Sequence, residues 1–98
     1  MKISKSSDGD TLTITVEGRL DTNDSHELQE ESVSLNGISN LVLDFSNVDY
    51  ISSSVLRVLL SFNKKMKGNM TVKNPNEIVG EIFEVTGFSD LLKIEWFL

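Results

Sequence analysis

The chain has 98 residues, no cysteine and a formal net charge of −6, with 39% apolar and 24% charged residues. These values are typical of one globular domain over 1–98, and the missing cysteine excludes disulfides, zinc–thiolate sites and thiol catalysis. An acidic chain without a basic run is a poor candidate for binding nucleic acid or an anionic membrane. Because no segment has the pattern of a signal peptide or a membrane span, we expect a cytoplasmic protein.

Periodicity and turn signals predict eight elements along the chain. In the second of them, Leu12, Ile14 and Val16 alternate with threonines, as in a half-buried strand. The run Leu41–Phe45 is mostly apolar, which predicts a central strand covered on both faces. In chain order we expect strands at 2–5 and 11–17, a helix from 21–24 to about 31, a strand at 41–45, a helix at 53–67, a strand at 70–73, a helix from 75 to 87 and a strand at 93–97.

Local signals also predict where these elements begin and end. Gly18 is expected to end the second strand, and a polar loop is expected between Phe45 and the following helix. Asn74 is expected to cap the last long helix, with Pro75 as its first residue. The buried face of that helix is predicted to consist of Ile78, Ile82, Phe83 and Val85.

Strands that alternate with helices favour an α/β fold with a largely parallel sheet and right-handed crossovers. Functional residues of such sheets gather at the carboxyl ends of the strands. The second and third predicted strands are followed by Asp21 and Ser53, so these two residues are the first candidates for a site.

Enzymatic and metal sites are weakly supported. His26 is the only histidine and could serve a serine nucleophile, but the chain has no nucleophile-elbow motif. Asp21, Asp24 and Glu27 match no calcium loop and are typical of a helix N-terminus. Asp44 is expected to have a structural role, bonded to the nearby backbone. We therefore expect no catalysis, no metal and no cofactor.

Three consecutive serines, Ser52, Ser53 and Ser54, precede or open the helix at 53–67. They could form a capping cluster, since serine is a preferred N-cap residue. They could equally accept a regulatory phosphate, because exposed N–H groups and the helix dipole favour negative charge at this place. The residues alone leave both interpretations open.

Four segments resemble the STAS domain family of the anti-sigma factor antagonist type, in the same order and over nearly the whole length. They are Gly18-Arg19-Leu20-Asp21, Leu41–Val48, Tyr50–Arg57 and Glu77–Leu92. The resemblance implies a single STAS-like domain, in which helices flank a mixed, mostly parallel sheet of four to five strands.

The resemblance also implies a function by partner switching. In that family, an anti-sigma factor serine kinase binds the unphosphorylated domain and releases a sigma factor, and a serine phosphatase reverses the phosphorylation. Ser53 matches the phosphorylated serine, with Ser52 and Ser54 as rival acceptors. The matching partner-binding positions are Asp21, Thr22, Ser52, Ser54, Val55 and Arg57.

Two positions depart from the family pattern. Ser52 stands where many members have aspartate, and Val55 stands where the family usually has glycine, which allows another backbone to approach closely. Val55 therefore supports an alternative, a STAS interaction module that is never phosphorylated. A third possibility is a small-ligand-binding STAS domain.

Overall fold

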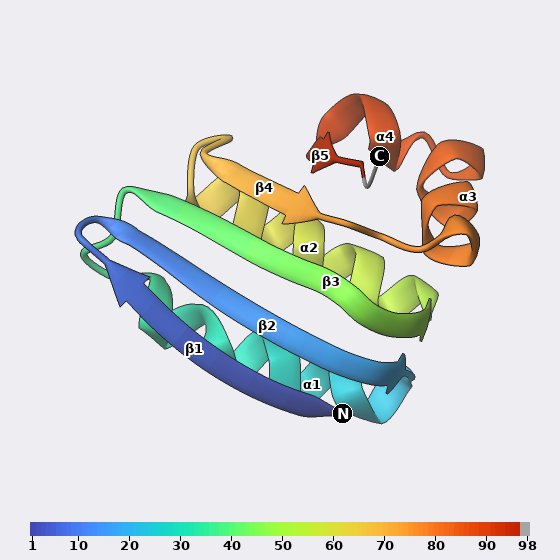
Figure 1. Ribbon diagram of the computed structural model, residues 1–98, viewed down its shortest axis with the longest axis horizontal. Coiled ribbons are helices and arrows are strands. Elements are labelled where there is room, and N and C mark those ends of the chain that lie inside the picture. Colours follow the sequence, from blue (N-terminus) through green and yellow to red (C-terminus); the bar gives the residue numbers. More distant parts are fainter. Residues whose placement is uncertain (97–98) are drawn as a thin grey trace.

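A five-stranded sheet organises the protein, for which a computed structural model describes residues 1–96 (Figure 1). The strands lie side by side in sequence order. The first pair is antiparallel and the other three pairs are parallel, which confirms the predicted mixed, mostly parallel sheet. The strands are β1 (Lys2–Asp8), β2 (Thr11–Leu20), β3 (Asn40–Ile51), β4 (Met70–Lys73) and β5 (Lys93–Glu95).

The helices connect the parallel strands in the predicted order. Helices α1 and α2 pack against each other and cover one face of the sheet, whereas α3 and α4 lie beyond the end of β4 (Figure 1). No helix within residues 1–96 is long and apolar enough to cross a membrane. The helices are α1 (Thr22–Glu30), a 3₁₀ helix η1 (Glu31–Leu35), α2 (Ser53–Lys65), α3 (Glu77–Val85) and α4 (Phe88–Leu91).

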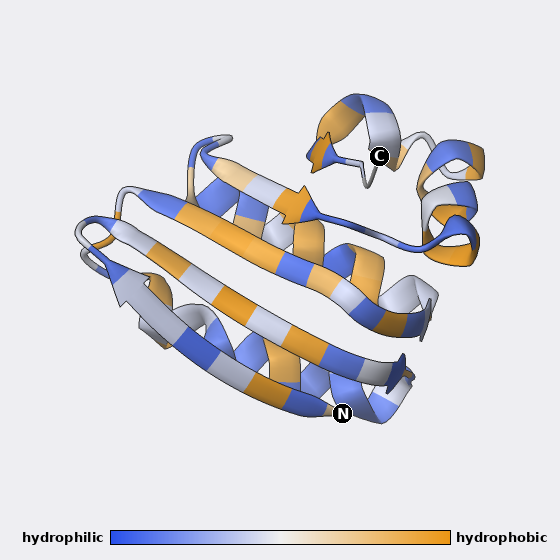
Figure 2. Ribbon diagram, viewed as in Figure 1, coloured by the Kyte–Doolittle hydropathy of each residue, from blue (hydrophilic) through white to orange (hydrophobic). Residues whose placement is uncertain are grey.

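The sheet has one buried and one partly exposed face. Along β2, apolar and polar residues alternate as predicted (Figure 2). On β3, Leu43 and Phe45 are fully buried, but Val42 and Asp44 on the opposite face are partly exposed. The prediction that this strand is covered on both faces is therefore wrong, since both helices that pack along the sheet lie on the same side of it.

Two expected strand ends are also wrong. Strand β2 continues past Gly18 to Leu20, and β3 continues through the expected loop to Ile51. Gly18 has a φ of +104°, and the pairing of β2 with β3 shifts register next to it. Glycine tolerates this backbone conformation, so a local irregularity replaces the expected break. Because both strands are longer than expected, β2 ends directly before Asp21 and β3 ends directly before Ser52.

The start and the buried face of α3 differ from the prediction. Asn76 rather than Asn74 is the N-cap, and its Oδ1 accepts a hydrogen bond of 2.8 Å from the N–H of Val79. Asn74 has a φ of +56° and lies outside the helix, as does Pro75. Val79 and Phe83 face the core, as predicted only for Phe83. Of the other residues expected in the buried face, Ile82 is half-buried and Ile78 and Val85 are exposed.

Candidate functional site

The carboxyl ends of β2 and β3 bring the two candidate segments together. Leu20 and Ile51, the last residues of these strands, are register partners. The N–H of Ser52 then donates a hydrogen bond of 2.9 Å to the carbonyl of Leu20. Asp21 and Ser52 are thus the first residues beyond two directly paired strand ends. The predicted neighbourhood of the Asp21 and Ser53 segments is confirmed by this pairing.

The three serines have different surroundings. Ser52 is the N-cap of α2, but its hydroxyl makes no capping bond and instead lies 2.8 Å from the hydroxyl of Ser54. Ser53 is the first residue of α2, is exposed, and its hydroxyl bonds to none of the described residues 1–96. Of the three side chains, that of Ser53 is consequently the most available to an enzyme or a partner.

Asp21 is the N-cap of α1 and forms a reciprocal capping box with Asp24. Its Oδ1 accepts from the N–H groups of Asn23 at 2.9 Å and Asp24 at 3.1 Å, while Oδ2 of Asp24 accepts from the N–H of Asp21 at 2.9 Å. The bond from the Asp24 backbone is the main reason that the pKa of Asp21 lies below its ordinary value of 3.8. A fixed negative charge therefore stands beside the serine segment, and Thr22 is exposed next to it.

Val55 and Arg57 lie on different sides of α2. The Val55 side chain is fully buried in the core, so it contributes nothing to the exposed surface that a partner could contact. A branched side chain is compatible with this first helical turn, because it points inward and leaves Ser53 uncovered. Arg57 is exposed and is four residues after Ser53, a spacing that places two side chains on the same side of a helix.

An arginine and a tyrosine that the sequence did not single out lie beside this site. The guanidinium of Arg19 stacks on the ring of Tyr50, 4.3 Å from its centroid. The two residues are register partners on β2 and β3, one position before Leu20 and Ile51. Each residue stands one position before the end of its strand, and this could have predicted the pair. The pair was not predicted because Tyr50 was expected in a loop and not in a strand. The pair adds a positive charge and an aromatic surface to this edge.

The remaining polar candidates have no part in this site. Asp44 accepts hydrogen bonds from the N–H and the hydroxyl of Ser46, at 3.0 and 2.6 Å, which confirms its structural role. His26 is exposed on α1. Within residues 1–96, no group of His, Asp and Glu is arranged to hold a metal ion.

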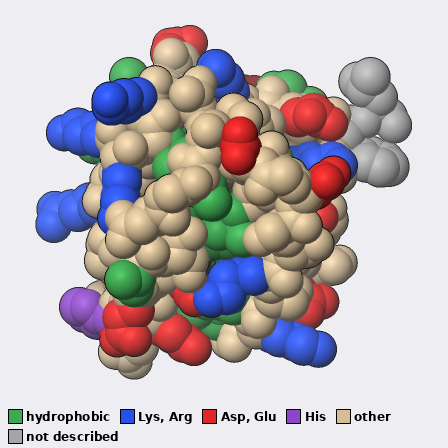
Figure 3. Space-filling view, turned by 90° about the vertical axis from the view of Figure 1, so that its left-hand side faces the viewer, with side chains coloured by type: hydrophobic (Ala, Val, Ile, Leu, Met, Phe, Trp, Pro, Cys, Tyr) green, Lys and Arg blue, Asp and Glu red, His purple; other side chains and the backbone are tan. Residues whose placement is uncertain are grey.

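The opposite end of the molecule holds the end of α2 and its lysines. Figure 3 shows this end, with apolar side chains near its centre and Lys and Arg side chains spread over it, some of them along the left margin. Lys64 and Lys65 lie in the last turn of α2, which has 13 residues. A helix of that length spans about 20 Å, so these lysines are remote from Ser53.

Comparison with known proteins identifies the family. The family model for the STAS domain matches residues 2–96. The chain belongs to the STAS domain family. This confirms the resemblance inferred from the four sequence segments. The chain is also similar to BtrV of Bordetella bronchiseptica, which is named as an anti-sigma factor antagonist. The two are 27% identical over 99 residues, which cover 96% of this chain and 85% of BtrV.

Solved structures of anti-sigma factor antagonists share the fold. SpoIIAA in its unphosphorylated form is 16% identical, with a TM-score of 0.83 over 95% of this chain and 87% of that chain. Phosphorylated SpoIIAA from Bacillus is 14% identical, with a TM-score of 0.73 over 95% and 90%. An anti-sigma factor antagonist from Mycobacterium paratuberculosis is 17% identical, with a TM-score of 0.87 over 99% and 86%. At these identities, the likeness concerns the fold.

Proposed function

We propose that this STAS domain is an anti-sigma factor antagonist that works by phosphorylation-controlled partner switching in the cytoplasm. It binds an anti-sigma factor serine kinase and so releases a sigma factor. The kinase phosphorylates Ser53 and ends the interaction, and a serine phosphatase restores it. The observation that carries the proposal is the exposed Ser53 hydroxyl at the start of α2, beside the charged Asp21 segment. The protein itself catalyses nothing in this scheme.

The proposed partner surface consists of Asp21, Thr22, Ser52, Ser54 and Arg57 around Ser53. It is supported by the direct pairing of the strand ends and by the exposure of Asp21, Thr22 and Arg57. The stacked pair of Arg19 and Tyr50 extends it along the same edge. Because β2 and β3 are buried on one face and hydrogen-bonded to each other, the surface has a rigid support.

Phosphorylation would change this surface without unfolding the domain. A phosphate adds roughly −1.5 to −2 charges and three acceptor oxygens. At the first position of α2 it meets exposed N–H groups and the positive end of the helix dipole, and Arg57 is one turn away. The new charge also lies beside the Asp21 carboxylate, so an acidic group of a bound partner would be repelled.

The decisive experiment compares the affinity of the cognate kinase for wild type, Ser53→Asp and Ser53→Ala. Ser53→Asp should weaken binding on the order of tenfold or more, because it introduces a charge at the centre of the interface. Ser53→Ala should keep binding but should not be phosphorylated. Ser61→Asp is the matched control, since Ser61 is also exposed on α2. Equal affinity of Ser53→Asp and Ser61→Asp would refute the switch.

A second candidate function is a STAS interaction module that is never phosphorylated, although the buried Val55 side chain no longer supports it on steric grounds. Phosphopeptide mapping of 47–64 from the native host separates the two. Phosphate on Ser53 supports the switch, whereas phosphate only on Ser52 or Ser54 moves the acceptor. The mutual hydrogen bond of Ser52 and Ser54 makes them less accessible than Ser53. A chain without phosphate during both growth and starvation would be a constitutive binding module.

A further inference from the structure

Exposed apolar side chains concentrate in the last quarter of the chain. Of the five large apolar residues that are strongly exposed within 1–96, four follow residue 77: Ile78, Val85, Leu91 and Trp96. Ile78 and Val85 are 56% and 78% exposed, and Ile82 between them is half-buried. Their spacing of four and three residues makes one continuous row along α3. Val79 and Phe83 form the separate row that packs on the core.

An acidic row runs beside this apolar row. Glu77, Glu81 and Glu84 have the same spacing, one position before Ile78, Ile82 and Val85, and all three are exposed. Within residues 1–96, none of the three glutamates forms a salt bridge. Like charges at this spacing destabilise a helix by a few tenths of a kcal/mol. Glu77 lies in the first turn of α3, where the helix dipole favours an acidic side chain, but helix stability does not explain Glu81 and Glu84, whereas a basic partner would.

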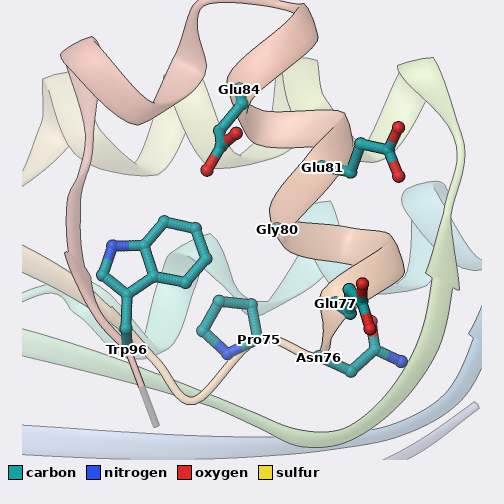
Figure 4. Close-up of a pocket in the computed structure, with 7 residues that line it drawn as sticks. All are labelled: Pro75, Asn76, Glu77, Gly80, Glu81, Glu84 and Trp96. Carbon is teal, nitrogen blue, oxygen red and sulfur yellow. The ribbon is translucent and has the colours of Figure 1, made fainter. Parts of the chain in front are cut away.

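A cavity of about 650 Å³ lies on the other side of the acidic row. It is formed between α3 and Trp96, and Figure 4 shows Glu84 directed toward the indole ring and Glu81 directed away from it. Gly80 permits the ring to lie against the helix, since a β-carbon at this position would come within 2.5 Å of Cζ3 of Trp96. An indole face beside carboxylates suits an arginine or lysine side chain, which gains from both.

We propose that α3 is a second docking surface, which binds an amphipathic helix of a partner protein with basic residues along one flank. The apolar face of the partner covers Ile78, Ile82 and Val85, and its basic flank lies over the three glutamates. One basic side chain enters the cavity beside Trp96. This surface is separate in sequence from the Ser53 segment, and the proposal does not rest on phosphorylation of Ser53.

The charge of this part of the chain favours a basic partner helix over two other possible partners, a second copy of the chain and an anionic membrane. Residues 74–96 contain five acidic residues and a single lysine. A second copy of the chain would bring two such acidic segments together, which costs energy at an interface. An anionic membrane surface would be repelled for the same reason. A basic amphipathic helix satisfies both the apolar row and the acidic row.

The test uses a synthetic helical peptide of about 18 residues, with a leucine face and an arginine flank. Its control carries glutamate in place of arginine. Trp96 is the only tryptophan of the chain and lines the cavity, so its emission reports binding when the peptide has no aromatic residue. We expect the basic peptide to shift this emission saturably and the acidic peptide to leave it unchanged.

Two variants locate the binding, each checked for an unchanged circular dichroism spectrum. Binding of the basic peptide should weaken on the order of tenfold in each of two double variants. The first combines Ile78→Ser with Val85→Ser, and the second combines Glu77→Gln with Glu81→Gln. The matched control is Val33→Ser, because Val33 is 70% exposed but lies in η1. No binding of the basic peptide, equal binding of both peptides or an equal effect of Val33→Ser would overturn the proposal. The proposal would also be overturned if the protein self-associates and the Ile78 and Val85 substitutions abolish this. The surface would then bind a second copy of the chain.

Discussion

Replacement of Val55 by glycine, the residue that the STAS resemblance implies at this position, tests how α2 is held on the core. The Val55 side chain is fully buried. Full burial of a valine side chain contributes about 1.5–3 kcal/mol, and the cavity left behind adds to the loss. Glycine is also a poorer helix former than valine. We therefore expect Val55→Gly to lower the free energy of unfolding by about 2–4 kcal/mol.

Two further variants separate packing from backbone effects. Val55→Ala keeps the β-carbon and improves helix propensity, so its loss should be smaller, about 1–2.5 kcal/mol. Val33→Ala changes the same residue type where the side chain is 70% exposed, and it should stay within about 0.5 kcal/mol of wild type.

Urea denaturation followed by far-ultraviolet circular dichroism measures these differences. A loss below about 0.5 kcal/mol for Val55→Gly would refute the inward packing of this side chain. In that case Val55 would be available to a partner after all. If the expected loss is found, the Val55 side chain contributes to core packing at the position where the STAS resemblance implies glycine.

Two other predictions concern Asp21 and Gly80. The pKa of Asp21 is lowered in the folded protein, so its stabilising effect is complete above the ordinary value of 3.8 and is lost as the pH falls through the folded pKa. Asp21→Asn keeps a capping acceptor that does not titrate, so its urea midpoint should fall less than that of wild type between about pH 6 and about pH 3; parallel decreases would contradict this. Gly80→Ala should displace the Trp96 ring and shift its emission to longer wavelength, while gaining up to about 1 kcal/mol of helix propensity. An unchanged emission spectrum would show that the ring does not lie against α3.

Local sequence patterns were enough to predict the order of the main helices and strands and the place of the candidate site. Alternation in β2, the apolar start of β3 and the serines before α2 are local patterns, and each reflects a preference that neighbouring residues impose on the backbone. Parallel pairing of β2 with β3 then follows from the crossover connection. The neighbourhood of Asp21 and Ser53 could be predicted for this reason, without knowledge of any side-chain contact.

Which surfaces are covered depends on how whole elements pack, and local patterns did not predict it. An apolar run such as Leu41–Phe45 is compatible with one or two covered faces, and the position of α1 and α2 selected one. Similarly, Val55 became a core residue because α2 lies on the sheet in a particular rotation. The same holds for Ile78 and Val85, which are apolar by sequence but exposed, since α3 presents Val79 and Phe83 to the core.

Contacts between distant segments were equally beyond the sequence. The stacking of Arg19 on Tyr50 depends on a register that Gly18 and its neighbouring irregularities set. The packing of Trp96 against Gly80 joins two segments through the return of the chain to the sheet in β5. Such contacts depend on where whole elements come to rest, which is the sum of many weak packing terms and is not encoded in any single motif.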